Sequence, residues 1–184
     1  MTIPSWLQAL QLFLIGLLSL WLVFTGGHSS QPPTKIFALT FAVLFFYASV
    51  DELFKLHLQL HTLLPEIGHR DWQGIYLAIG VTTSILFCRD FIDLWRFHPK
   101  SILMMLLGIS IFVFGGFGLE IFKDELLASI VGLLVEQGNL ITLLVEKLRV
   151  AVEEFSEMLG ESLILYGLCL FLAKRWDKKA LSSQ

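Results

Sequence analysis

The sequence predicts an all-α fold: a polytopic transmembrane helical bundle of about five spans plus one amphipathic or re-entrant helix. Composition is the first reason. Of 184 residues, 55% are hydrophobic and only 16% are charged, whereas about a quarter of the residues in soluble domains carry charge. Segment length is the second reason, because several apolar runs reach the roughly 20 residues that a helix needs to cross about 30 Å of hydrocarbon.

The predicted spans are separated by segments with the composition of loops. A turn rich in Gly, Ser and Pro occupies 25–35, a polar stretch occupies 63–72, and the short connection RFHPKS occupies 96–101. Gly, Pro and polar clusters of this kind interrupt regular structure. The five predicted spans are therefore residues 5–25, 36–57, 72–94, 101–122 and 150–173.

Residues 123–148 are harder to assign. The segment is apolar but is interrupted at Gln137-Gly138-Asn139. We interpret it as an interfacial or re-entrant helical segment, followed by a helix that begins near residue 140 and continues into the last span. A sixth full span is the alternative. No internal repeat or second domain is visible, so residues 1–184 are expected to form a single integral membrane domain.

An odd number of spans places the two termini on opposite sides of the membrane. The 13 Lys and Arg residues are biased toward the side of the C-terminal KRWDKK, and basic residues favour the cytoplasmic face. The sequence thus predicts an N-terminus outside and a cytoplasmic C-terminus, in a plasma or inner membrane. Membrane lipid is the expected partner, together with a homo-oligomer or a larger membrane complex. The net charge of −3 gives no basic patch for nucleic acid.

Most of the 16 acidic residues lie on the predicted outer half, and several fall inside spans. Counting about 1.5 Å per residue from the inner end of each span puts Asp51, Glu120 and Glu157 at a shared depth of about 22–27 Å, with Glu161 at about 18 Å. Acids at membrane depth are costly and usually face the bundle interior, where they pair with cations, protons or metals. Three non-adjacent spans are therefore expected to share one polar pocket.

The last span carries its acids on one stripe. Glu146, Glu153, Glu157 and Glu161 fall within about 80° of each other around a helix. Like charges at this spacing repel, so a positive group should face them, or some of them should be protonated. In the second predicted span, Lys55 lies within one turn of Asp51 and Glu52, and we predict an ion pair there.

Glycines mark the places where helices can approach closely. The stretch FGGFGLE supplies Gly115, Gly116 and Gly118, and Gly160 lies in the last span. Small residues let helix backbones pack closely in membranes. We expect helix contacts at these positions.

Three short motifs, ASVDELFKLH, FGGFGLE and VEEFSEMLGESLILYG, resemble those of a widespread family of uncharacterised small multi-pass membrane proteins. In that family the patterns are DExxxxHE, GxxxE and EExxEMLG, in the same order. The resemblance supplies no activity, but it implies that one set of residues acts together: Asp51, Glu52, His57, Glu120, Glu153, Glu154 and Glu157. Where the family has Glu after the His, this chain has Leu58, and His61 is the nearest residue that can compensate.

A metal site, with a di-metal centre as one form of it, is the first functional hypothesis. Glu and His side chains that project into a helical bundle hold the metals of carboxylate-bridged proteins, and such ligands suit iron, manganese or zinc. The soluble Glu-x-x-His pattern is absent, and an ideal helix points His57 about 140° away from Glu52. The candidate ligands are Asp51, Glu52, His57, His61, Glu120, Glu153, Glu154 and Glu157. No haem or nucleotide is expected, and no catalytic residue is assigned.

Two further hypotheses remain open. Acids within membranes serve as proton relays and ion sites, which makes a proton- or cation-conducting protein one alternative. In the other, the acids neutralise Lys55, Arg149 or Lys147 and fix helix register, and the protein is a structural or assembly accessory subunit of a larger membrane complex.

Overall fold

The structure, a computed structural model, describes residues 3–25, 32–63, 71–118 and 139–182. Every described element is a helix, as the sequence predicts. The elements are α1 (Ile3–Thr25), α2 (Lys35–Phe54), α3 (Leu56–Leu63), α4 (Asp71–Leu86), α5 (Cys88–Phe97), α6 (Pro99–Ile111), the π-helix η1 (Phe112–Phe117) and α9 (Asn139–Ser182). Within these described ranges, four helices are long and apolar enough to cross a membrane, and the number is five if the bent pair α4–α5 counts as one span.

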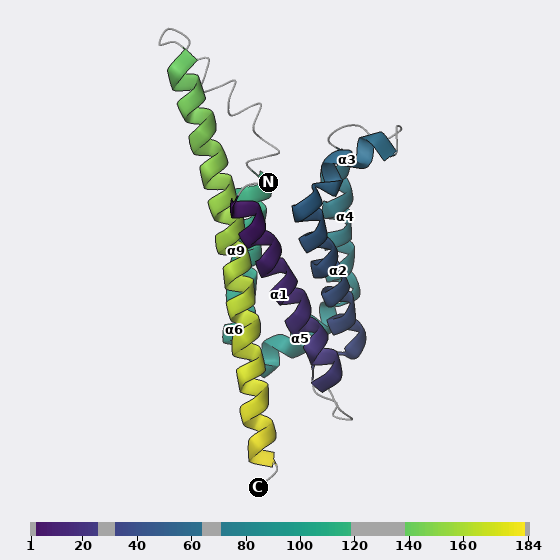
Figure 1. Cartoon of the computed structure of the whole chain (residues 1–184). Coiled ribbons are helices and arrows are strands. Elements are labelled where there is room, and N and C mark those ends of the chain that lie inside the picture. The colour runs from purple at the N-terminus through teal and green to yellow at the C-terminus, as the bar shows by residue number, and fades with distance from the viewer. Residues whose placement is uncertain (1–2, 26–31, 64–70, 119–138, 183–184) are drawn as a thin grey trace.

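The helices form a bundle in which α1 lies between α2 and α9 (Figure 1). Helix α6 packs against α9, and α4 stands beside α2. Helices α1 and α9 run in one direction while α2 and α6 run in the other, so that the two termini lie toward opposite ends of the bundle. We call the end where α1 begins, near Asp51 and Glu157, the acidic end. The end where α9 finishes, near Arg96 and Lys174, is the basic end.

The contact between α6 and α9 is built on glycine. A Cβ on Gly108 would lie 2.5 Å from the carbonyl oxygen of Gly160, and a Cβ on Gly160 would lie 2.7 Å from that of Gly108. Gly167 meets the carbonyl oxygen of Ser101 in the same way, at 2.7 Å. Close backbone approach of this kind is how small residues hold membrane helices together. We call the contact of Gly108, Gly160 and Gly167 the glycine seam, and the expected role of Gly160 is confirmed.

Helix α2 ends earlier than the predicted span 36–57. Lys55 adopts a left-handed backbone conformation with φ of 51°, and a residue in this conformation cannot continue a right-handed helix. The chain resumes as α3 at Leu56, and the amide of Leu58 donates to the carbonyl of Lys55 at 3.1 Å. The break turns His57 back toward the end of α2.

The predicted span 72–94 is not one straight helix. The axis bends by 65° between α4 and α5, and α5 lies crosswise at the basic end (Figure 1). The sequence of α5, CRDFIDLWRF, explains the bend, because a short helix with apolar residues on one face and charges on the other lies along an interface. The carboxylate of Asp90 holds α5 to the start of α2: it accepts from the Thr34 amide at 2.7 Å and from the Thr34 hydroxyl at 3.2 Å.

Helix α9 is much longer than a membrane span. Its 44 residues extend over about 66 Å, and its first turns project beyond the rest of the bundle at the acidic end (Figure 1). From Asn139, the first described residue after 118, it continues without a break into the last span, as predicted for the helix that leads into that span. The interfacial segment predicted at 123–148 falls mostly on residues 119–138, which lie outside the described residues.

Candidate functional site

The polar side of α9 faces α1 and η1 at the acidic end. The side-chain amide of Gln8 donates to Glu157 Oε2 at 2.7 Å, and Gln8 is only 3% exposed. Gly116 of η1 leaves room for this carboxyl group, because a Cβ there would lie 2.4 Å from Cγ of Glu157. The position of the Glu157 carboxyl group thus depends on the Gln8 donor of α1 and on the space left by the absence of a side chain at Gly116 of η1.

One turn further along α9, Glu161 is more deeply buried. Its exposed fraction is 3%, and its Oε2 atom is buried without a hydrogen-bond partner among the described residues. The charged groups that act on it are Glu157 on its own helix, Glu52 on α2 and Lys55 just after the end of α2. We call these two carboxyl groups the Glu157–Glu161 site.

The acids of α2 make local pairs. Asp51, 6% exposed, accepts from the backbone amide of His57 at 2.7 Å and pairs with the ring Nδ1 of His57 at 2.8 Å. The left-handed turn at Lys55 makes both contacts reachable. Lys55 Nζ lies 2.5 Å from Glu52 Oε1. The predicted ion pair of Lys55 is therefore confirmed, with Glu52 as its partner.

The acids near the start of α9 find their cation on the same helix. Arg149 lies 3.0 Å from Glu146 and 2.5 Å from Glu153, at the i,i+3 and i,i+4 spacings that bring helical side chains together. The sequence predicts a positive group facing the acidic stripe of the last span. For Glu146 and Glu153, two of the four acids in that stripe, this group is Arg149. Glu157 and Glu161 lie beyond the reach of these pairs and enter the bundle.

Aromatic rings and hydroxyls join α4 to this end. The ring centroid of His57 lies 4.5 Å from that of Trp72, and the hydroxyl groups of Tyr47 and Tyr76 are 3.2 Å apart. These contacts connect the beginning of α4 with α2 and α3. The rest of α4 is largely exposed.

The predicted metal ligands are brought together only in part. Asp51 and His57 are in contact, and Glu52 lies within electrostatic range of Glu157. Glu153 is bound by Arg149, and Glu154 is half-buried on the same helix. His61 belongs to α3 with its side chain outside the description, and Glu120 lies outside the described residues altogether. Among the residues that are described, no group of three His, Cys, Asp or Glu side chains is arranged to hold a metal ion.

Sequence reasoning missed the polar residues of α1. Besides Gln8, the amide of Gln11 donates to the hydroxyl of Ser162 at 2.7 Å, and the hydroxyl of Ser49 donates to the carbonyl of Ala9 at 2.7 Å. The sequence did indicate them, because Gln8 and Gln11 lie one helical turn apart in a segment that is otherwise nearly all apolar. Two amides on one face of a span indicate a polar partner on a neighbouring helix.

The helices and the buried polar side chains between them define a multi-pass integral membrane protein. A family model matches residues 1–173, and the chain belongs to that family, a domain of unknown function designated DUF8692. The match includes all three motifs that carry the acidic residues. No curated protein matches the chain, and no solved structure matches it.

Proposed function

We propose that this membrane protein takes up and releases protons at the Glu157–Glu161 site, as a protein of the proton- or cation-conducting class. The observation that carries the proposal is the side chain of Glu161, which is 3% exposed and has one carboxyl oxygen without a hydrogen-bond partner in the described part of the chain. A carboxyl group at this depth needs a proton or a cation.

The cations nearby have partners of their own. Lys55 lies against Glu52, and Arg149 bridges Glu146 and Glu153. Glu157 receives a neutral amide donor from Gln8 rather than a charge. Because two ionised carboxylates one turn apart repel each other, a proton that resides on the pair relieves both the repulsion and the cost of burial.

The ionisable side chains that act on the pair, Glu52, Lys55 and Glu153, lie toward the acidic end. In that direction the half-buried Glu153 and Glu154 follow along α9 toward its projecting turns. In the other direction the described interior of the bundle is mostly apolar: it includes Leu168 and Phe171, with the hydroxyls of Ser19 and Ser101 as small polar groups. This distribution supports proton exchange with the acidic end, and passage to the basic end requires a partner protein or a second conformation.

Infrared difference spectroscopy of the purified protein in lipid nanodiscs, recorded while pH is varied, tests the proposal. We expect a protonated-carboxyl C=O band that titrates and that is absent from Glu161→Gln. Glu154→Gln is the matched control, because it removes a half-buried acid from the same helix, and it should keep the band. A band that is unchanged in Glu161→Gln would sink the proposal.

A metal site is the second candidate, and the contact between Asp51 and His57 favours it. An imidazole and a carboxylate 2.8 Å apart are two ligands of the kind that iron, manganese and zinc accept. Elemental analysis of purified protein separates the two candidates. Stoichiometric metal that is lost in His57→Gln supports this second candidate, and metal-free, folded protein excludes it.

A further inference from the structure

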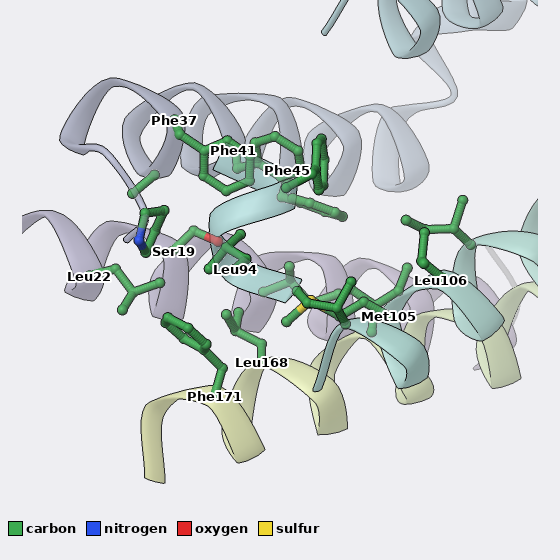
Figure 2. Close-up of a pocket in the computed structure, with 17 residues that line it drawn as sticks. Ser19, Leu22, Phe37, Phe41, Phe45, Leu94, Met105, Leu106, Leu168 and Phe171 are labelled. Atoms are coloured by element: carbon green, nitrogen blue, oxygen red, sulfur yellow. The ribbon is translucent and has the colours of Figure 1, made fainter. Parts of the chain in front are cut away.

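The basic half of the bundle contains an apolar cavity of about 80 Å³ (Figure 2). Five helices contribute to its lining, which includes Leu22 of α1, Phe37 of α2, Leu94 of α5, Met105 of α6 and Phe171 of α9. A water molecule needs about 10–15 Å³ by the same measure, so the cavity has room for about five to eight water-sized groups. Apolar cavities of this kind stay dry and accept hydrocarbon.

The cavity extends from the basic end toward the middle of the membrane. Figure 2 shows Leu22 and Phe171 at one end of the lining and Leu106 at the other. Leu106 and Ile109 line the cavity and are also 46% and 41% exposed on the outside of α6. They lie near the middle of the candidate span Pro99–Gly116, where the surroundings are lipid chains. The opening therefore admits an apolar chain from the bilayer.

A buried cation follows the lining residues Leu168 and Phe171 along α9 toward the basic end. Arg175 is 6% exposed, and its Nη1 atom is buried without a hydrogen-bond partner among the described residues. Arg175 follows Phe171 by four residues and Leu168 by seven, which places the three on one face of α9. A buried guanidinium without a counter-charge is costly, and its planar donors match a phosphate group.

The acids of the basic end do not supply the counter-charge. Asp90 is bound to Thr34, Asp93 lies 3.9 Å from Arg96, and Asp177 is exposed. No ion pair joins any of the three to Arg175 in the described part of the chain. The remaining charged groups at this end are predominantly cations, and they are exposed: Lys35, Arg89, Arg96, Lys100, Lys174 and Lys178.

We propose that the cavity and Arg175 together bind one anionic phospholipid. The end of an acyl chain fills the cavity, and the phosphate of the headgroup accepts hydrogen bonds from the Arg175 guanidinium at the basic end. The exposed cations around it favour an anionic headgroup over a zwitterionic one. This site is separate from the Glu157–Glu161 site and does not depend on its function.

Native mass spectrometry of the detergent-purified full chain tests the proposal, with phosphatidylglycerol and phosphatidylcholine added in turn. We expect one phosphatidylglycerol bound per chain, at least about tenfold more tightly than phosphatidylcholine, since a charge-assisted contact contributes a difference of this order. Arg175→Gln should remove the preference. Lys174→Gln removes one charge from the neighbouring exposed position and should keep it.

A cavity variant tests the acyl chain separately from the headgroup. Ser19 lines the cavity and is buried, so Ser19→Leu should fill part of it and weaken both lipids without removing the preference. Ser84→Leu, at an exposed position on α4, should have no effect. Circular dichroism and size-exclusion chromatography establish that each variant is folded, and a variant that fails to fold is replaced by Arg175→Lys or Ser19→Val.

Three results would overturn the proposal. Equal binding of the two lipids to the wild type is the first. The second is an unchanged preference in folded Arg175→Gln. The third is inorganic phosphate that raises the melting temperature as much as phosphatidylglycerol does, since that would assign the site to a free anion.

Discussion

The two faces of α9 hold their neighbours by different means. Toward α6 the contact is backbone against backbone, at the glycine seam. Toward α1 it is made by long polar side chains, with Gln8 bound to Glu157 and Gln11 bound to Ser162. A contact between two backbones leaves no room for an added atom. In a contact between side chains, by contrast, a side chain can change its conformation while the two helices stay packed. The first face therefore fixes the bundle, and the second can carry chemistry that changes with protonation.

The largest effect is expected from Gly160→Leu, which breaks the seam. Any Cβ at Gly160 meets the carbonyl oxygen of Gly108 at 2.7 Å and Phe112 Cβ at 2.9 Å, so the two helices must separate. We expect a loss of about 3 kcal/mol or more in the free energy of unfolding, measured by thermal unfolding in detergent. Gly80→Leu is the control, because a Cβ there has no atom within 4 Å. Equal losses of unfolding free energy in both variants would show that the close approach of helices at the glycine seam does not contribute specially to stability.

Adding one methyl group at Gly108 or at Gly116 tests whether the neighbouring group, a backbone oxygen or the Glu157 side chain, can move away. Gly108→Ala places a Cβ 2.5 Å from a backbone oxygen, and Gly116→Ala places one 2.4 Å from Cγ of Glu157. The backbone cannot yield but the Glu157 side chain can rotate. We expect a loss of about 2 kcal/mol for Gly108→Ala and about 1 kcal/mol for Gly116→Ala. Only Gly116→Ala should also change the carboxyl bands in the infrared spectrum, and the reverse order of losses would contradict the comparison.

Gln8→Leu breaks the polar face. The substitution leaves Glu157 Oε2 without its donor in a buried place, and we expect a loss of about 2 kcal/mol. In a double-mutant cycle with Glu157→Leu, the second substitution should recover about 1 kcal/mol or more, because two apolar partners leave no polar atom unpaired. Additive losses in the cycle would show that the Gln8–Glu157 hydrogen bond does not couple the two helices.

The smallest effect is expected from Ser162→Ala. Its hydroxyl accepts from Gln11 at an exposed position, where a lost hydrogen bond changes stability by no more than about 0.5 kcal/mol. The same unfolding measurement serves here, with wild-type protein run in parallel. A loss as large as that of Gln8→Leu would mean that the polar face acts as one network instead of two separate contacts.

Features that depend on neighbouring residues in the chain could be predicted from the sequence. The helical class follows from composition, the continuity of α9 into the last span follows from its unbroken sequence after Asn139, and the Lys55–Glu52 pair follows from i,i+3 spacing. The role of Gly160 was also predictable, because close packing requires a small residue somewhere on that span. Each of these rests on local geometry or on a single helix.

Features that depend on which helices become neighbours could not be predicted. The Gln8 amide reaches Glu157 across 149 positions of sequence, and Asp90 binds Thr34 across 56. The sequence around Gln8 or Asp90 does not indicate which distant residue each will contact. The bend at Phe87 could not be predicted for a related reason. The segment CRDFIDLWRF continues an apolar run, so it resembles the end of a span. Only its position in the bundle shows that its charged residues lie along an interface. Arg175 likewise resembles the exposed lysines around it in sequence and differs only in burial.

The bend between α4 and α5 has a consequence for the membrane itself. Helix α4 has 16 residues and a length of about 24 Å, about 6 Å short of a typical hydrocarbon layer. On the opposite side of the bundle, α9 is more than long enough. We therefore expect the bilayer to thin on the α4 side, which would produce an asymmetric hydrophobic mismatch. A protein with this shape is expected to favour thin membranes and to gather where the bilayer is already deformed.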